Sequence, residues 1–445
     1  MVAEQISAAA GLAGLDASLA RLVKVAERRA ERLHRPVLAS ASVILDGDVR
    51  PQQLLWLSRG MTEWSSLAGE SMNLVCWGAA AHIQDDADLA TVSAAWKELV
   101  TDSVRDWLTS QSVGPVIVFG HSFAEDCDTE GPWKAFGRSR AIVPHVSIRE
   151  YNGSLLATAS VVVGQDGALP VGGRSPGFRT GTGSKAAFVE AVEAAVLRLR
   201  RGDAEKVVLT RSVHLETGPV EPMSLLGRLD SMYPETCRYA ISVAGATLVG
   251  ATPELLCSVR GHSVRTMALA GSVPTNVGAS AALSDPKLLR EHAIVAEYIE
   301  KTLGPRSETI HVNPEPRVVS LRNIRHLRTD IRAELGAPAS VLEVAQWLHP
   351  TPAIGGYPVD RARSLIKELE HHDRGWYTGP FGWIDAAGDG DCWVALRCAL
   401  LTDTGAELFA GAGIVRDSDA LLEFAETDWK LTAMRDALAL PARSK

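Results

Sequence analysis

Two ionisable side chains stand at the ends of apolar, strand-like runs. Lys206 opens "KVVLTR", where consecutive Val and Leu residues predict a buried strand, and Glu254 follows a proline in "ATPELL". A lysine at a strand end can lay its aliphatic stem along the apolar surface and keep its ammonium in water. It can also act as a base once it gives up its proton, and these residues alone leave both interpretations open. A lone acid such as Glu254 is usually solvated.

A second group of charges is spaced for one face of a helix. In "LLEFAETDWK", Glu423, Glu426 and Lys430 are three and four residues apart, so they share a helix face. An exposed Glu–Lys pair of this kind would contribute only about 0.3–0.5 kcal/mol. Glu291, in "KLLREHAIVAEYIEK", places another carboxylate on a second predicted helix. Clustered carboxylates without thiolates suit Mg²⁺, which prefers oxygen ligands, so two helices presenting acids to one ion form a physically sound site.

Two other motifs are rejected as catalytic or metal sites. "GHSFA" (120–124) lacks the second glycine of a nucleophile elbow and is followed by loop-like sequence, so we expect His121 and Ser122 to be structural. "EHHDR" (370–374) has adjacent histidines, which point in different directions on a helix, so a polar helix end is expected. The Gly-rich segment 172–184 does not follow a strand and is not a dinucleotide fingerprint.

Composition excludes several function classes. The 445 residues are 46% hydrophobic and 22% charged, with a net charge of −8. This balance argues against a nucleic-acid-binding or anionic-membrane surface, because either needs a basic patch. The six cysteines form no CxxC pair, and neither a secretion signal nor a membrane-length apolar run is present. We therefore expect a soluble, cytoplasmic protein with no nucleic-acid or membrane partner, and the sequence indicates no obligate protein partner.

The charged residues must be positioned by the predicted helices and strands, which follow one another along the chain in clusters. Apolar periodicity and turn residues predict helices over 1–35, 86–108, 184–200, 284–303, 338–348 and 417–438, strands over 36–45, 115–120 and 206–215, hairpins over 146–163 and 392–415, and a meander over 238–274. Ser184 is the expected N-cap of its helix. Without regular βαβ alternation, this order favours an α+β architecture. Residues 172–183 are expected to form a flexible connection between an N-terminal part (1–171) and a C-terminal part (184–440).

Read in order, these stretches resemble the chorismate-utilising enzymes, and most closely isochorismate synthase. The motifs that carry the resemblance cover roughly 184–438: "KVVLTR", "TPELL", "LAGS", "REH", "RHL", "HPTPAIGG", "RGWYTGPFGW", "ALRCAL", "AGAGIV" and "EFAETDWK". The resemblance implies a single large unit of two stacked antiparallel β-sheets flanked by helices. It also implies that residues 1–171 form the N-terminal part of the sheet sandwich and 184–440 the chorismate-binding catalytic region.

The resemblance also assigns roles. Lys206 would activate water to attack ring carbon C2 of chorismate, and Glu254 would protonate the departing C4 hydroxyl. This chemistry needs an uncharged amine and a protonated acid. The implied cofactor is Mg²⁺, with Glu291 and Glu426 as ligands and Glu423 as a ligand through water. The implied substrate-binding residues are Gly271, His326, Ala353, Tyr377, Arg397, Gly411 and Lys430.

Related activities stay open as alternatives. Anthranilate synthases commonly carry Gln at the Lys206 position, and salicylate synthases typically have Thr where Ala353 stands, so isochorismate formation is favoured. Salicylate synthase is the second candidate, and a non-catalytic chorismate-binding relative is the third. The product could feed menaquinone or siderophore biosynthesis. Leu288 departs from the family, which usually has Asp or Asn there, and this departure puts the affinity for Mg²⁺ in doubt.

Overall fold

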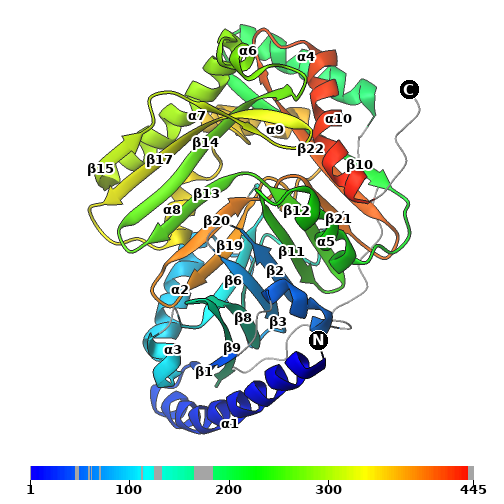
Figure 1. Cartoon of the computed structure of the whole chain (residues 1–445). Coiled ribbons are helices and arrows are strands. Elements are labelled where there is room, and N and C mark those ends of the chain that lie inside the picture. The colour runs from blue at the N-terminus through cyan, green and yellow to red at the C-terminus, as the bar shows by residue number, and fades with distance from the viewer. Residues whose placement is uncertain are drawn as a thin grey trace.

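The computed structural model describes residues 2–45, 50–58, 61, 63–69, 72–111, 114–124, 133–164 and 184–438 (Figure 1). The predicted flexible connection over 172–183 lies outside these residues. Within the described chain, no helix is both long and apolar enough to cross a membrane.

Two large β-sheets form the centre of the molecule. Sheet A has twelve strands in the order β18 (Gly356–Tyr357), β10 (Lys206–Leu215), β22 (Ala406–Val415), β21 (Cys398–Leu401), β12 (Ala246–Thr252), β11 (Cys237–Val243), β2 (Trp64–Ala68), β3 (Asn73–Trp77), β8 (Val146–Tyr151), β9 (Ser154–Val163), β1 (Val37–Leu45) and β5 (Val104–Arg105). Sheet B has ten: β15 (Ser307–Val312), β17 (Ile324–Leu335), β14 (Ser263–Pro274), β13 (Leu255–Arg260), β20 (Gly390–Val394), β19 (Pro380–Asp385), β6 (Val116–His121), β7 (Ser139–Val143) and β4 (Ala81–His82), with β16 (Arg317–Ser320) beside β17. Among the described strands, the pairing of β1 with β5 is the parallel one. The predicted α+β fold with two sheets is therefore confirmed.

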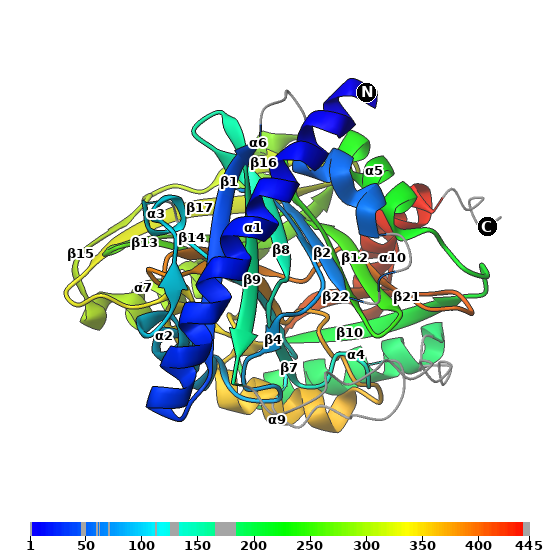
Figure 2. The same ribbon diagram turned by 90° about the horizontal axis from the view of Figure 1, so that it is seen from below.

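The sheets pack face to face, and helices cover their outer faces. Between the sheets, the rings of Tyr239 on β11 and Phe381 on β19 lie with their centroids 4.1 Å apart, inside a continuous apolar core. Sheet A is covered by α1 (Val2–Leu33), α4 (Lys185–Arg200), α5 (Pro222–Met232), α9 (Val359–Leu369) and α10 (Ala420–Ala437). Sheet B is covered by α2 (Leu89–Thr101), α7 (Pro286–Leu303) and α8 (Val341–Leu348). Shorter helices are α3 (Trp107–Gln111), α6 (Ala279–Leu283), η1 (Pro51–Ser58) and η2 (Gly304–Arg306). Figure 2 shows α1 lying across β1 and β9.

The N-terminal and C-terminal parts of the chain share both sheets. In sheet A the two parts meet where β11 pairs with β2, and in sheet B where β19 pairs with β6. Figure 1 shows the N-terminal part, blue to cyan, at one end of the molecule and the C-terminal part, green to red, at the other. We call these two strand pairings the seams.

Several local predictions are confirmed. The side chain of Ser184 accepts a hydrogen bond from the N–H of Ala187 and caps α4. The hairpin of β8 and β9 turns at Asn152 and Gly153, both with positive φ (49° and 76°), as a two-residue hairpin requires. The helix predicted over 86–108 is too long, since α2 ends at Thr101 and is followed by β5 and α3.

The predicted meander over 238–274 is wrong in one respect that matters for the site. The chain leaves sheet A after β12 and enters sheet B at β13, so the meander is two hairpins in different sheets. Pro253 stands at this crossover, where its missing N–H disrupts no ladder. A second crossover lies between β20 in sheet B and β21 in sheet A, so the hairpin predicted over 392–415 also joins both sheets.

Candidate active site

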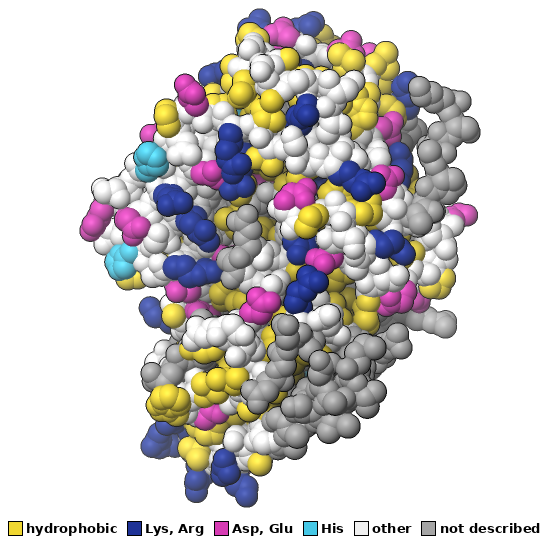
Figure 3. Space-filling view, in the orientation of Figure 1, with side chains coloured by type: hydrophobic (Ala, Val, Ile, Leu, Met, Phe, Trp, Pro, Cys, Tyr) yellow, Lys and Arg dark blue, Asp and Glu magenta, His cyan; other side chains and the backbone are white. Residues whose placement is uncertain are grey.

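A cavity lies where the chain crosses between the sheets. Its walls include Pro253 and Glu254 from the first crossover and Leu396 and Arg397 from the second. The predicted site residues that line it are Glu254, Gly271, Glu291, His326, Ala353, Tyr377, Arg397, Gly411 and Lys430. Lys206, Glu423 and Glu426 are not part of this lining. Lys206 lies next to Glu291, Glu426 next to Lys430, and Glu423 next to Lys287. On the face shown in Figure 3, Lys and Arg side chains gather around the hollowed middle of the molecule.

Lys206 is fully buried at the first position of β10. Its Nζ lies 3.0 Å from Oε1 of Glu291, which is on α7. A side chain with no exposed surface does not keep its ammonium in water, so the snorkelling interpretation fails. An amine buried at this depth costs free energy unless it is paired or neutral, and such groups are concentrated at functional sites.

Glu254 is 5% exposed at the first crossover. Burial raises the pKa of its carboxyl to about 7, although the nearby cations Lys206, Lys430 and Arg397 act in the opposite direction. Desolvation is the larger effect because it penalises the charged form of the acid. Near neutral pH, Glu254 can therefore hold a proton and donate it.

Arg397 and His326 lie in contact in the lining of the cavity. A guanidinium nitrogen of Arg397 donates to Nε2 of His326 at 3.0 Å, while Nδ1 of His326 lies 3.1 Å from the Ser272 hydroxyl. Burial, and then the charges of Arg397 and Lys430, lower the pKa of His326 well below its usual range, so the imidazole is neutral. Among the described residues, Arg397 forms no ion pair, which leaves its charge available to an anionic ligand.

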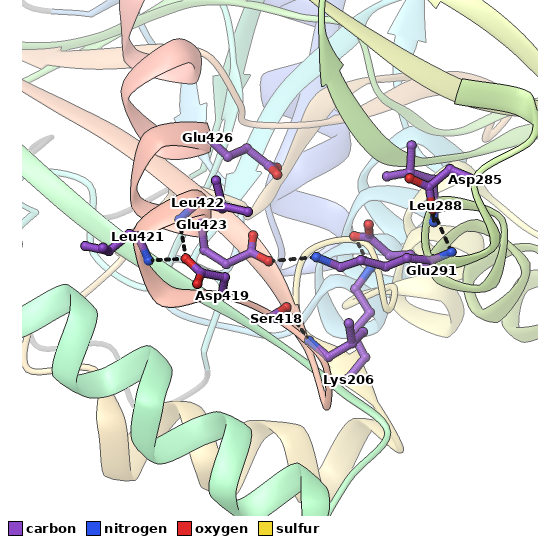
Figure 4. A network of polar contacts seen from close by, with 12 residues as sticks. Lys206, Asp285, Leu288, Glu291, Ser418, Asp419, Leu421, Leu422, Glu423 and Glu426 are labelled. Atoms are coloured by element: carbon purple, nitrogen blue, oxygen red, sulfur yellow. Dashed lines mark hydrogen bonds and ion pairs between the residues drawn. The ribbon is translucent and has the colours of Figure 1, made fainter. Parts of the chain in front are cut away.

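The predicted metal ligands lie on two neighbouring helices, Glu291 on α7 and Glu423 and Glu426 on α10 (Figure 4). In the described part of the chain, no three His, Cys, Asp or Glu side chains already converge as a metal cluster. Each glutamate is instead paired with a lysine.

The three ion pairs have similar geometry. Lys206 lies 3.0 Å from Glu291, Lys287 lies 3.0 Å from Glu423, and Lys430 lies 2.6 Å from Glu426. Burial, and then the charge of Glu426, raise the pKa of Glu423, which shows that the acids repel one another. Buried carboxylates that need positive charge are a suitable oxygen donor set for a divalent cation.

Comparison of the sequence with known protein families identifies the family of this chain. The profile of the family described as "Chorismate binding enzyme" matches residues 27–170 and 178–439, most of the chain. This chain belongs to the chorismate-binding enzyme family. It is 32% identical over 444 residues to the salicylate biosynthesis isochorismate synthase of Pseudomonas aeruginosa, covering 92% of each chain. It is also 32% identical over 359 residues to isochorismate synthase MenF of Bacillus subtilis, covering 74% of this chain and 76% of the relative.

A solved structure agrees with the fold of this chorismate-binding enzyme. DhbC from Bacillus anthracis, a proposed 2,3-dihydroxybenzoate-specific isochorismate synthase, superposes with a TM-score of 0.71 at 28% identity. The superposition covers 88% of this chain and 100% of that chain. The family resemblance and the two-sheet fold predicted from sequence are both confirmed.

Sequence reasoning missed some residues of the site. Gly413, on β22, also lines the cavity, and a Cβ there would lie 2.4 Å from Oε1 of Glu291. Ser272, whose hydroxyl contacts His326, was missed as well. The alternation of Gly411 and Gly413 on one face of a predicted strand could have indicated a close approach to other groups.

Leu288 occupies the position at which the family usually has Asp or Asn. The side chain is 8% exposed and packs against Ala282 and Leu327 in a small apolar cluster. The Leu288 side chain therefore offers no oxygen to the carboxylate site next to it.

Proposed function

We propose that this enzyme is an isochorismate synthase, which converts chorismate to isochorismate by adding water at C2 and losing the C4 hydroxyl. The relatives named isochorismate synthase support the reaction. The observation that carries the proposal is the pair of Lys206 and Glu254, a buried amine and a carboxyl with a pKa near 7 beside one cavity.

In the proposed mechanism, the two residues act on opposite ends of the displacement. Lys206, once it has given up its own proton, takes a proton from the attacking water as the water oxygen bonds to C2. The ring double bonds shift, and the C4–O bond breaks as Glu254 gives its proton to the leaving hydroxyl. One water enters and one leaves, so the reaction is an isomerisation, and hydroxide never has to depart unprotonated.

The other residues bind and orient the substrate. Arg397, with its charge free of an acidic partner among the described residues, would bind one carboxylate of chorismate, and Lys430 and the bulge at Gly271 would face the other. Neutral His326 keeps Arg397 oriented without adding charge. Gly411, Tyr377 and Ala353 shape the wall against which the ring lies.

We further propose that the enzyme depends on Mg²⁺, held by Glu291 and Glu426 directly and by Glu423 through water. When bound, the ion would hold the ring carboxylate and offset the negative charge of the glutamates. The ion would add positive charge to a site in which three glutamates are already paired with three lysines, which favours binding of the substrate, a dicarboxylate.

A product assay tests the proposal. Purified protein, chorismate and MgCl₂ are incubated, and products are separated by chromatography, with Lys206→Gln as the comparison variant. We expect isochorismate without pyruvate, and a loss of rate on the order of 10²–10⁴-fold in the variant. Unchanged turnover by Lys206→Gln would contradict the mechanism.

The other outcomes distinguish the alternatives. Salicylate together with pyruvate would identify a salicylate synthase, the second candidate. Chorismate binding by calorimetry without any turnover would identify a non-catalytic relative. The relatives from Pseudomonas aeruginosa and Bacillus subtilis favour the first outcome, since both are isochorismate synthases.

A further inference from the structure

The strand that carries Lys206 lacks a full partner on its outer edge. β10 lies next to the end of sheet A, where β18 pairs only with Lys206 and Val207. Beyond one further bond, from the N–H of Val208 to the carbonyl of Gly355, no strand formed by the described residues lies beside this edge. An unpaired edge leaves backbone groups to be satisfied by other means.

Two side chains after α9 take the place of the missing strand. Glu370 accepts a hydrogen bond from the N–H of Thr210 at 2.6 Å, and Arg374 donates to the carbonyl of Val208 at 2.7 Å. Glu370 and Arg374 also form a two-pronged ion pair, with N–O distances of 2.8 and 2.6 Å. Their side chains are 4% and 3% exposed, so this pair is buried against the strand edge.

Arg374 reaches two further segments. One guanidinium nitrogen donates to the carbonyl of Ile354 at 2.8 Å and lies 3.4 Å from the hydroxyl of Thr378. Together with its other contacts, Arg374 uses the five donors that a guanidinium has. Its plane also lies over the ring of Phe123, 4.0 Å from the centroid. No other side chain offers as many donors in one plane.

The three groups that Arg374 contacts belong to three different segments of the chain that line the cavity. Val208, Ile354 and Thr378 all line it, whereas Arg374 itself does not. Val208 is two residues from Lys206, Ile354 follows Ala353, and Thr378 follows Tyr377.

We propose that Arg374, held by Glu370, is a positioning residue that fixes the strand bearing Lys206 relative to two other segments that line the cavity, at Ile354 and at Thr378. It acts from behind the cavity wall and touches no reacting atom. The kinetic test of this inference rests on the proposed function. The structural part of the inference, that Arg374 fixes the edge of β10, is independent of the proposed function.

The alternative is an ion pair that only stabilises the fold. The chain offers a matched control in Arg260 and Asp391, a pair that is also bonded through two oxygens, at 3.1 and 3.0 Å. Asp391 is fully buried, and Arg260 likewise donates to a backbone carbonyl, that of Gly390. Neither Arg260 nor Asp391 lines the cavity.

The experiment compares Glu370→Gln and Arg374→Lys with Asp391→Asn. Steady-state kinetics with chorismate are measured at a temperature at which thermal denaturation shows all variants folded. We expect kcat to fall on the order of 10-fold to 100-fold in Glu370→Gln, with a smaller change in KM, because misplacing a catalytic group by about 1 Å can cost 10²-fold. Arg374→Lys keeps the charge but loses most of the five guanidinium contacts, so its kcat should fall at least as far as that of Glu370→Gln. Asp391→Asn should lower the melting temperature while keeping the kcat of the parent.

Hydrogen exchange gives a second measurement that does not depend on turnover. We expect peptides covering 206–210 to exchange faster in Glu370→Gln and Arg374→Lys, and unchanged in Asp391→Asn. Parent-like kcat together with parent-like exchange in both Glu370→Gln and Arg374→Lys would overturn the inference, as would an equal loss of kcat in Asp391→Asn. If the parent itself does not convert chorismate, the proposed function fails, and the exchange data alone then decide on the fixing of β10.

Discussion

Glu254 holds its proton to a higher pH than a carboxyl in water, because burial raises its pKa to about 7. As the proposed proton donor, it is active only while protonated. We therefore expect kcat/KM for isochorismate formation to fall as the pH rises above about 7, approaching a tenfold loss per pH unit. A pH–rate profile checks this, with Glu254→Gln expected to be inactive throughout. A rate that stays level or rises between about pH 7 and 9 would contradict the assignment.

The same pKa has a consequence for stability. Between its ordinary pKa and about 7, Glu254 binds a proton more tightly in the folded protein than in the unfolded chain. The folded state then carries more protons, so the contribution of Glu254 to the free energy of unfolding decreases as the pH rises through that window.

Lys287 gives a prediction about metal binding. Its ammonium lies 3.0 Å from Glu423, where it competes with a cation for the carboxylate. We expect Lys287→Met to bind Mg²⁺ about twofold to fivefold more tightly in calorimetry, since a partly exposed ion pair contributes roughly 0.2–1 kcal/mol. Lys301→Met, at the exposed end of α7, is the control. Weaker binding by Lys287→Met would show that Lys287 supports the site instead of competing with the ion.

At the residue scale, sequence supplied the identity of the charged groups but not their surroundings. Lys206 at a strand start fits both a solvated and a buried lysine, because its environment is made by residues far away, such as Glu291 and Gly413. Likewise, nothing in the spacing of "EHHDR" indicates that Arg374 reaches Val208 and Ile354. Such contacts are set by tertiary packing, which local spacing does not encode.

Strand β22 shows how an element can be shaped around a charge. Gly413 leaves room for Glu291, since a Cβ would lie 2.4 Å from the carboxylate oxygen and 2.9 Å from Cε of Lys206. We expect Gly413→Ala to remain folded and to lose at least about tenfold in turnover, because both groups must move. The matched control is Gly227→Ala in α5, where the Cβ meets nothing within 4 Å and alanine should stabilise the helix by about 0.5–1 kcal/mol. Full activity in Gly413→Ala would refute the close packing of the two groups.

Element boundaries were predictable where periodicity is strong. The strand predicted over 206–215 is β10, and the turn predicted at 403–405 joins β21 to β22. The crossovers were not predictable, because a strand that changes sheet has the same alternation of apolar residues as one that stays. Yet the crossovers carry Glu254 and Arg397, so the least predictable part of the fold is where two site residues lie.

At the scale of the whole molecule, the two seams decide whether the parts can exist separately. All described residues that line the cavity lie between 208 and 430, yet β11 and β19 take their partners β2 and β6 from the N-terminal part. The boundary predicted between 171 and 184 remains a prediction as a boundary in sequence. The shared sheets argue that it does not separate two independent folding units.

Expression of residues 184–445 alone tests this. We expect the fragment to be insoluble or unfolded, because it exposes the edges of β11 and β19 and the apolar core between the sheets. Circular dichroism and size-exclusion chromatography measure the outcome, and co-expression with residues 1–171 should restore soluble protein. A fragment that is monomeric, cooperative in thermal unfolding and active would show that the seams are dispensable.

The two crossovers also limit how the enzyme can move. At Pro253–Glu254, and again before Arg397, the backbone passes from one sheet to the other beside the cavity and so links the two sheets covalently. Closure of two layers over a ligand needs a hinge that is distant from the binding site, whereas here the two covalent connections between the sheets lie beside the cavity. The distance between the two sheets at the cavity should therefore change little when substrate binds. Entry and release of the ligand should instead depend on movements of side chains at the rim of the cavity.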